Sequence, residues 1–328
     1  MMKNTVLVSA PYMLPIMDRF GPVFSHYDCE LIIPDVHERL AEREILQYAG
    51  QFDGTVCGDD RYTRTVIERC VPRLKVISKW GTGIDSIDKT AAEENDIQVS
   101  RTVNAFTGPV SDSVMAYILT FARKQPWMDR AMKTGKWEKI PGISLSECTI
   151  GVIGVGFIGK EVLRKAHAFG MKLMANDIQE ISKDFIKKYD VEMVSLDNLL
   201  SRSDFVSVNC DLNPSSRYLL DENAFKKMKP TAIVVNTARG PIIKETALVS
   251  ALEEKRIAGA GLDVFENEPL SADSPLLEMG QVMLAPHNSN SSPKAWENVQ
   301  WNTIKNLLDG LSIPHPDFEE IIEKYSKK

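Results

Sequence analysis

The feature that most constrains the fold of this chain is a regular alternation of short apolar, β-rich runs with longer helical patterns. From Thr149 onward the apolar runs are TIGVIG, KLMAND, EMVS, FVSVNC, AIVVNT, AGAGLDV and VMLAPH. They are apolar throughout, as expected of strands that helices cover on both faces of a parallel sheet. Strand, helix and strand in series predict an α/β fold with a doubly wound parallel sheet.

The first third of the chain shows the same alternation. Its strand candidates are TVLVSA, CELIIP, GTVCG, LKVISKW and IQVSR, and residues 36–50 and 88–96 have helical patterns. A chain of 328 residues is long enough for two domains. We therefore predict two α/β domains of unequal size, with a long helix over residues 107–124 between them.

Charge and cysteine content exclude several functional classes. The formal net charge is −6, and no basic stripe predicts a nucleic-acid or anionic-membrane partner. The cysteines are Cys29, Cys57, Cys70, Cys148 and Cys210. They are odd in number and form no C-x-x-C pair, which predicts reduced, buried thiols in a cytosol and no metal site.

The N-terminal segment is apolar, but it does not have the pattern of a signal peptide. Pro11 and Pro15 interrupt it, and no A-x-A-like cleavage site follows. No apolar run approaches the ~18 residues that a membrane span needs. A cytoplasmic protein is the expectation.

The stretch TIGVIGVGFIG places three glycines between a predicted strand and a predicted helix. Gly154 suits a tight turn, Gly156 allows the backbone to approach a pyrophosphate, and Gly159 allows close helix–strand packing. The next strand ends in Asp177, which can accept hydrogen bonds from ribose hydroxyls, and no arginine follows to hold a 2′-phosphate. The pattern predicts a Rossmann-like site for NAD; the alternative is a glycine-rich turn without a ligand.

Four charged residues follow predicted strands further along the chain. Arg239 closes AIVVNTARG, Asp263 and Glu268 lie in GLDVFENEP, and His287 closes VMLAPH. Each of them alone is typical of a solvated loop. Together, downstream of a dinucleotide loop, they supply a cation for a substrate carboxylate, a proton donor and an acidic residue that adjusts the pKa of that donor. Hydride transfer to a 2-keto acid requires these groups.

Six segments carry a resemblance to the D-isomer-specific 2-hydroxyacid dehydrogenase family, which includes phosphoglycerate dehydrogenase and glyoxylate/hydroxypyruvate reductase. They are LKVISKWGTGIDSID, VNAFTGPVSDSVMAYILTFAR, GVIGVGFIG, NTARG, GLDVFENEP and APH. The resemblance implies a discontinuous substrate-binding domain, residues 1–104 completed by 297–328. It also implies an NAD-binding Rossmann domain over residues 105–296, and a homodimer.

By the same resemblance, the catalytic residues are Arg239, Glu268 and His287. Arg239 would pair with the substrate carboxylate, protonated His287 would donate to the developing alkoxide, and Glu268 would raise the pKa of that imidazole. The glycine turn that holds the substrate carboxylate falls on Gly81, Thr82 and Gly83. The expected cofactor contacts are Gly154, Gly156, Phe157, Ile158, Gly159, Asp177, Thr237, Ala238, Asp263 and Asn290.

The sequence departs from the family pattern where a substrate phosphate would bind. In the segment VCGDDR, Cys57 stands at the position where phosphoglycerate dehydrogenases hold the substrate phosphate with an arginine, although Lys79 or Arg61 could serve as phosphate ligands instead. The expected substrates are therefore a glycerate, hydroxypyruvate, glyoxylate or 3-phosphoglycerate class of acid. Two other functions remain open: an NAD-binding corepressor-like scaffold with little turnover, and phosphite or formate oxidation.

The second departure is the stretch PHNSNSS, where the family commonly has glycines after the histidine. We predict that it forms the rim of the active site. Asn290 tolerates a left-handed backbone and would replace such a glycine, while Ser289 and Asn290 would add polar side chains beside the substrate. The alternative is a solvated loop, because Ser/Asn clusters are common in turns.

Overall fold

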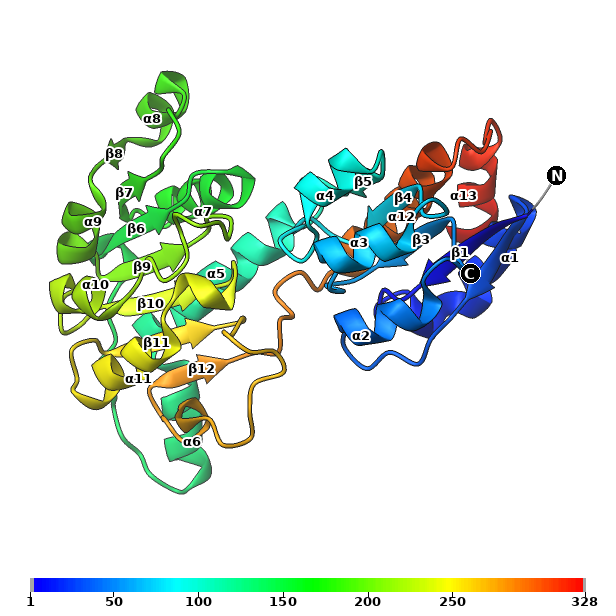
Figure 1. Cartoon of the computed structure of the whole chain (residues 1–328). Helices are drawn as coiled ribbons and strands as arrows, with labels where there is room; N and C mark the ends of the chain where they lie inside the picture. The colour runs from blue at the N-terminus through cyan, green and yellow to red at the C-terminus, as the bar shows by residue number, and fades with distance from the viewer. Residues whose placement is uncertain (1–2, 327–328) are drawn as a thin grey trace. The chain divides into compact units, whose positions relative to one another are not determined.

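The computed structural model describes residues 3–326, which form two compact units (Figure 1). The described part of unit 1 runs up to Ala105 and resumes at Ser292, and unit 2 is Phe106–Ser291. Each unit holds one sheet whose strands are all parallel, with helices around it. The predicted fold class, two doubly wound α/β domains, is confirmed.

Unit 1 has a five-stranded sheet in the order β2-β1-β3-β4-β5. The strands are β1 (Asn4–Val8), β2 (Cys29–Ile32), β3 (Gly54–Cys57), β4 (Val76–Lys79) and β5 (Gln98–Arg101). The helices are α1 (Met17–His26), α2 (Glu42–Ile45), α3 (Arg64–Cys70), α4 (Lys89–Glu94), α12 (Pro293–Gly310) and α13 (Phe318–Ser326), with 3₁₀ turns η1 (Leu14–Ile16) and η2 (Leu46–Tyr48). The strand order reverses between β1 and β3, so the switch point of this sheet lies there.

Helices cover both faces of the unit 1 sheet. On one face Ile77 of β4 is packed in a core with Ile67 of α3 and Ala91 of α4. On the other face Ser78 donates a hydrogen bond to the carbonyl of Thr303 in α12 at 2.7 Å. In Figure 1 the C-terminal helices α12 and α13, coloured orange to red, lie beside the blue strands of the N-terminal segment. Coverage on both faces explains why the strand sequences do not alternate.

The helix predicted over residues 36–50 is much shorter in the structure. It begins only at α2 because Leu40 is held in an irregular segment by its backbone groups. The Leu40 amide donates to Asp60 Oδ1 at 2.6 Å, and the Leu40 carbonyl accepts from the Arg61 amide at 3.1 Å. These partners, distant in sequence, replace the helical ones, so the periodicity of residues 36–41 was misleading.

Unit 2 has a seven-stranded sheet in the order β12-β11-β10-β9-β6-β7-β8. The strands are β6 (Thr149–Ile153), β7 (Lys172–Asn176), β8 (Val191–Met193), β9 (Phe205–Val208), β10 (Ile233–Asn236), β11 (Gly259–Leu262) and β12 (Val282–Leu284). The helices are α5 (Thr107–Arg123), α6 (Gln125–Lys133), α7 (Phe157–Ala168), α8 (Lys183–Tyr189), α9 (Leu196–Arg202), α10 (Glu222–Lys227) and α11 (Glu245–Glu253), with 3₁₀ turns η3 (Leu145–Glu147), η4 (Gly240–Ile242) and η5 (Pro275–Leu277). The switch point lies between β6 and β9.

Successive residues of the central strands enter different cores of unit 2. Val234 of β10 packs in one cluster with Leu248 of α11, whereas its neighbours Ile233 and Val235 pack in another with Val114 of α5. Both residue parities are therefore buried, as the uniformly apolar strand sequences predicted.

The chain enters unit 2 between Ala105 and Phe106 and leaves it between Ser291 and Ser292. The sequence-based boundaries were 104 and 297. The chain returns to unit 1 before residue 297 because α12, which lies wholly in unit 1, already begins at Pro293. The Ser292 hydroxyl caps this helix by accepting a hydrogen bond from the Ala295 amide at 3.4 Å.

All five cysteines are free thiols. Four are buried, but Cys210 is only partly buried, so the expectation of buried thiols is wrong at this position. Within residues 3–326 no helix is both long enough and apolar enough to cross a membrane.

Candidate active site

The predicted catalytic residues follow neighbouring strands of the unit 2 sheet. β10, β11 and β12 are adjacent and parallel, so their carboxyl ends meet at one edge. Arg239 follows β10, Asp263 follows β11 directly, and His287 follows β12. The structure thus places these three residues after neighbouring strands at the same edge of the sheet.

The turn that carries Arg239 is held by a buried asparagine that the sequence-based prediction missed. Asn236 accepts a hydrogen bond from the Ala238 amide and donates one to the Arg239 carbonyl, both at 3.0 Å. Gly240 is required next, because a Cβ there would lie 1.8 Å from the Phe265 carbonyl oxygen. The sequence N-T-A-R-G therefore packs the turn after β10 directly against the loop after β11.

His287 and Glu268 form a hydrogen-bonded pair. The imidazole Nδ1 lies 3.0 Å from Glu268 Oε2, and Glu268 Oε1 accepts from the Phe265 amide at 3.0 Å. The two side chains are 24% and 20% exposed, so the pair is largely shielded from solvent without being sealed from it. The carboxylate is anchored at one oxygen and orients the imidazole with the other.

Asp263 fixes the backbone that follows His287. Its side chain accepts hydrogen bonds from the amides of Asn288 and Ser289, both at 2.8 Å, and its carbonyl accepts from the His287 amide at 2.8 Å. Asp263 is only 1% exposed. Burial raises the pKa of this carboxyl, and the two amide hydrogen bonds oppose that rise.

The backbone of PHNSNSS differs from the prediction. The residue in the left-handed region is His287, with φ of 49°, and Asn290 does not adopt a positive φ, so the glycine-replacement argument for Asn290 was wrong. His287 takes this conformation while its amide bonds the carbonyls of Asp263 and Ala285. Ser289 is buried, and its carbonyl accepts from the Ser113 hydroxyl at 3.4 Å. A freely solvated loop does not describe this stretch.

The glycine loop after β6 has the geometry that its spacing predicts. Gly154 has φ of 89°, and a Cβ there would lie 2.6 Å from the Cys210 amide nitrogen. A Cβ on Gly159 would lie 2.0 Å from the Gly154 carbonyl oxygen, whereas a Cβ on Gly156 would meet nothing within 4 Å. The first and last glycines are thus needed by the fold, and Gly156 leaves open space at the start of α7, beside the amides of Phe157 and Ile158.

Two buried polar atoms and one carboxylate lie at the ends of nearby strands. Thr237 Oγ1 and Asn209 Oδ1 are buried and have no hydrogen-bond partner within residues 3–326. Asp177, after β7, accepts from the amides of Val155 at 2.6 Å and Gln179 at 2.7 Å. Asn209 was missed by the sequence-based prediction, although its place after β9, beside the switch point, would have identified it.

Open space at a helix N-terminus and unsatisfied polar atoms at the same sheet edge are what a dinucleotide needs. The residues present therefore fit NAD. Within residues 3–326 no group of three or more His, Cys, Asp or Glu side chains is arranged to hold a metal ion.

Gly81, Thr82 and Gly83, the expected substrate-carboxylate turn, follow β4 in unit 1. Gly81 has φ of 115° and accepts from the Thr102 amide at 2.9 Å. The Thr82 hydroxyl donates to the Thr102 carbonyl at 2.9 Å. The turn is therefore tied to the segment that follows β5.

Of the three residues considered for a substrate phosphate, two are buried and one is exposed. Cys57 is fully buried at the end of β3. Lys79 is buried, with Nζ 3.2 Å from Asp59 Oδ1 and donating to the Trp80 carbonyl at 3.0 Å. Arg61 is exposed.

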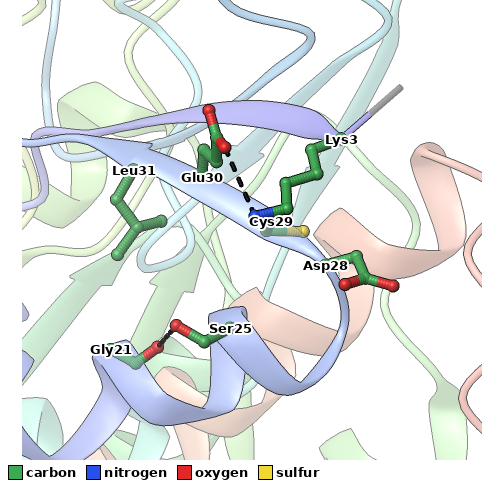
Figure 2. Close-up of a pocket in the computed structure, with 7 residues that line it drawn as sticks. All are labelled: Lys3, Gly21, Ser25, Asp28, Cys29, Glu30 and Leu31. Carbon is green, nitrogen blue, oxygen red and sulfur yellow. Dashed lines mark hydrogen bonds and ion pairs between the residues drawn. The ribbon is translucent and has the colours of Figure 1, made fainter. Parts of the chain in front are cut away.

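Figure 2 shows a surface hollow elsewhere on unit 1, lined in part by Lys3, Asp28, Cys29 and Glu30. Lys3 precedes β1 and Asp28 precedes β2, so the hollow lies at the amino ends of these strands. Lys3 and Glu30 form an exposed ion pair at 3.4 Å across it. Ligands of open parallel sheets bind at the opposite, carboxyl edge, and this hollow is therefore no part of the candidate active site.

An arginine, an oriented imidazole and a dinucleotide-binding loop at one sheet edge define a nicotinamide-dependent dehydrogenase. Comparison with known proteins is more specific. A family model described as "D-isomer specific 2-hydroxyacid dehydrogenase, NAD binding domain" matches residues 115–289. The chain belongs to this family.

Individual relatives agree with the family match. The chain is 37% identical over 243 residues to a glyoxylate reductase of Korarchaeum cryptofilum, covering 72% of this chain and 73% of that protein. It is 37% identical over 297 residues to a D-3-phosphoglycerate dehydrogenase of Methanocaldococcus jannaschii, covering 87% of this chain but 56% of that protein. The solved structure of a glyoxylate reductase from Paecilomyes thermophila aligns with a TM-score of 0.82 at 28% identity, covering 95% of this chain and 96% of that one.

The resemblance inferred from the sequence is therefore confirmed. The protein is an NAD-dependent oxidoreductase of the 2-hydroxyacid dehydrogenase class, and NAD as the cofactor is confirmed with it.

Proposed function

We propose that this enzyme uses NADH to reduce a small, unphosphorylated 2-keto acid of the glyoxylate or hydroxypyruvate class. Relatives named glyoxylate reductase and glyoxylate/hydroxypyruvate reductase B support this substrate class. The chain spans 54% and 56% of two relatives named D-3-phosphoglycerate dehydrogenase.

The observation that carries the proposal is the His287–Glu268 pair at 3.0 Å. Because Nδ1 faces Glu268, Nε2 is the nitrogen that carries the transferable proton. Protonated His287 donates it to the oxygen that forms at C2 of the acid, and Glu268 favours the imidazolium needed for that step. A solvated histidine would have no such orientation.

Arg239 binds the substrate carboxylate with a planar, two-pronged donor and polarises the C2 carbonyl. Gly81, Thr82 and Gly83 bind the carboxylate through backbone amides. NADH, when bound, supplies the hydride to C2. In the oxidative direction His287 accepts the hydroxyl proton, and Arg239 and the glycine turn hold the acid as before.

The cofactor is held by the residues around the unit 2 switch point and the adjoining strand ends. We assign the pyrophosphate to Gly154, Gly156, Phe157, Ile158 and Gly159, the ribose to Asp177, and the nicotinamide end to Thr237, Ala238, Asp263 and Asn290. The buried, unsatisfied Thr237 Oγ1 supports this assignment. Asp263 contributes chiefly by holding residues 287–289, because its carboxylate already accepts two amide hydrogen bonds.

Charge at unit 1 favours an unphosphorylated substrate. Lys79, the buried cation nearest to the Gly81 turn in sequence, is paired with Asp59 and also interacts electrostatically with Asp60. With two carboxyls against its one ammonium group, Lys79 is not an unpaired cation for a substrate phosphate.

The enzyme acts as a homodimer in the cytosol under this proposal. Met132, Trp137 and Ile143, on α6 and the segment after it, are 51%, 83% and 41% exposed. A second copy would cover these side chains in the proposed dimer. Five free thiols agree with a reducing compartment.

The test is NADH oxidation by the purified chain against glyoxylate, hydroxypyruvate, pyruvate and 3-phosphohydroxypyruvate. We expect the highest kcat/KM for one of the unphosphorylated acids. Preference for the phosphorylated acid would contradict the substrate assignment, and NADH binding without turnover of any acid would favour the corepressor-like scaffold.

Glu268→Gln tests the acid. This variant keeps a hydrogen-bonding side chain but loses the charge that favours imidazolium, so the fall in reduction rate with rising pH should move to lower pH. An unchanged pH profile would remove Glu268 from the mechanism.

A further inference from the structure

The carboxyl edge of the unit 1 sheet is held together by a buried carboxylate. Asp60 is 0% exposed. Its Oδ2 accepts from the Ser9 hydroxyl at 2.5 Å, and its Oδ1 accepts from the Leu40 amide at 2.6 Å. Ser9 follows β1, Leu40 lies in the segment after β2, and Asp60 follows β3. One side chain therefore connects the loops after three strands.

The neighbouring pair extends this network to the fourth strand. Asp59 and Lys79 are 3.2 Å apart, and Lys79 ends β4. The Lys79 ammonium donates to the Trp80 carbonyl at 3.0 Å, directly before the Gly81 turn. We refer to Ser9, Leu40, Asp59, Asp60 and Lys79 as the Asp60 cluster.

The cluster lies at the switch point of its sheet, between the ends of β1 and β3. Burying charged groups there costs desolvation energy, and apolar side chains of similar size often give equal stability. Its hydrogen bonds instead join the irregular segments after β1, β2 and β3 to one another. The Leu40 segment, for example, is held out of helical conformation by Asp60 and Arg61.

We propose that Asp60 is a positioning residue for the 2-keto acid: through the Asp60 cluster it holds the loop that carries Gly81, Thr82 and Gly83. This inference rests on the proposed function, which assigns the substrate carboxylate to that loop. Asp60 touches neither substrate nor cofactor in this role, so its loss affects substrate affinity rather than NADH affinity.

The test compares Asp60→Ala with Asp60→Asn. Alanine removes both hydrogen bonds, whereas asparagine can accept from the Leu40 amide and donate to Ser9, losing only the charge. We expect Asp60→Ala to raise KM for the keto acid about tenfold or more while KM for NADH stays within about twofold, and Asp60→Asn to recover most of the loss.

Asp53 supplies a matched control at the other end of the same strand. It precedes β3, accepts from the Thr5 amide at 2.7 Å and pairs with Arg73 at 3.1 Å. Asp53→Ala should lower the free energy of unfolding but leave KM for the keto acid near the wild-type value. An equal rise in KM in both variants would mean that Asp60 acts only through global stability, and would overturn the proposal.

Hydrogen exchange of the backbone gives a second readout that needs no substrate. Amides of residues 79–83 should exchange faster in Asp60→Ala than in Asp53→Ala when the two are compared at equal global stability. Unchanged exchange in this loop would also overturn the proposal. A wild type that reduces no 2-keto acid would instead contradict the proposed function, and the exchange data would then decide whether Asp60 positions the loop.

Discussion

The two sheets of this protein share a parallel architecture but use their switch points differently. In unit 2 the point between β6 and β9 is lined by a glycine loop, and a Cβ on Gly156 would meet nothing within 4 Å. In unit 1 the point between β1 and β3 is filled by Ser9 and Asp60, hydrogen-bonded at 2.5 Å. One switch point is open to an anion, and the other is closed by a carboxylate.

The difference shows how one topology supports two tasks. A dinucleotide needs amides and empty space at the helix N-terminus, and glycine provides both. A buried carboxylate excludes such an anion and instead connects neighbouring loops. In unit 1 the turn proposed to bind the substrate carboxylate is therefore not at the switch point but at Gly81, after β4.

The largest effect on activity should come from the proposed catalytic residues at the carboxyl edge of the unit 2 sheet. Arg239→Lys keeps the charge but loses the two-pronged geometry. The transition state should lose about 2–4 kcal/mol of stabilisation, measured as a fall in kcat/KM for the keto acid. NADH affinity should hardly change. Arg202→Lys, at an exposed pair with Glu192, is the matched control and should behave as wild type. Near wild-type turnover by Arg239→Lys would remove this residue from the site.

The closed switch point of unit 1 should be visible in the pH dependence of stability. Burial raises the pKa of Asp60 to about 6 from its ordinary 3.8, while Lys79 and the hydrogen bonds from Ser9 and Leu40 oppose the rise and Asp59 adds to it. A raised carboxyl pKa stabilises the fold fully below about pH 4, and this contribution is lost as pH rises through 6. Between pH 7 and pH 4 the wild type should gain on the order of 2 kcal/mol relative to Asp60→Asn.

Chemical denaturation of wild type and Asp60→Asn at a series of pH values measures this difference. Both proteins share every other titrating group, including the nearby Cys57 and Tyr62, so their difference isolates Asp60. If the difference in free energy of unfolding stays constant from pH 4 to pH 7, the pKa of Asp60 is the same in the folded and unfolded states. The two switch points would then not differ in electrostatics in this way.

The smallest expected effect concerns the open switch point. Gly156→Ala adds a methyl group to open space, so the free energy of unfolding should change little while the Kd for NADH rises about tenfold. Gly159→Ala is the contrasting variant, since its Cβ would lie 2.0 Å from the Gly154 carbonyl oxygen and should destabilise the fold itself by about 1–3 kcal/mol. Calorimetric NADH titration and thermal unfolding separate the two. Unimpaired NADH binding by Gly156→Ala would argue against the pyrophosphate assignment.

Much of the site could be predicted from the sequence because parallel strands place their carboxyl ends at one edge. Apolar runs located β10, β11 and β12 closely enough that Arg239, Asp263 and His287 were expected together. Glycine spacing likewise identified the turn after β6, since only glycine takes φ of 89° there without strain. Predictions from local sequence failed where a partner distant in sequence determines the backbone conformation. Examples are the helix expected over residues 36–50 and the left-handed conformation expected for Asn290.

By itself, then, the sequence determined the two parallel sheets, the dinucleotide loop and the set of charged residues at strand ends, because apolar periodicity and glycine spacing act over a few residues. Tertiary structure alone decided that Glu268 meets Nδ1 of His287, that Asp263 holds the amides of residues 288 and 289, and that Asp60 connects Ser9 to Leu40. These contacts join residues 19 to 51 positions apart. They depend on strand order and on which loops pack together, and no local pattern in the sequence specifies either.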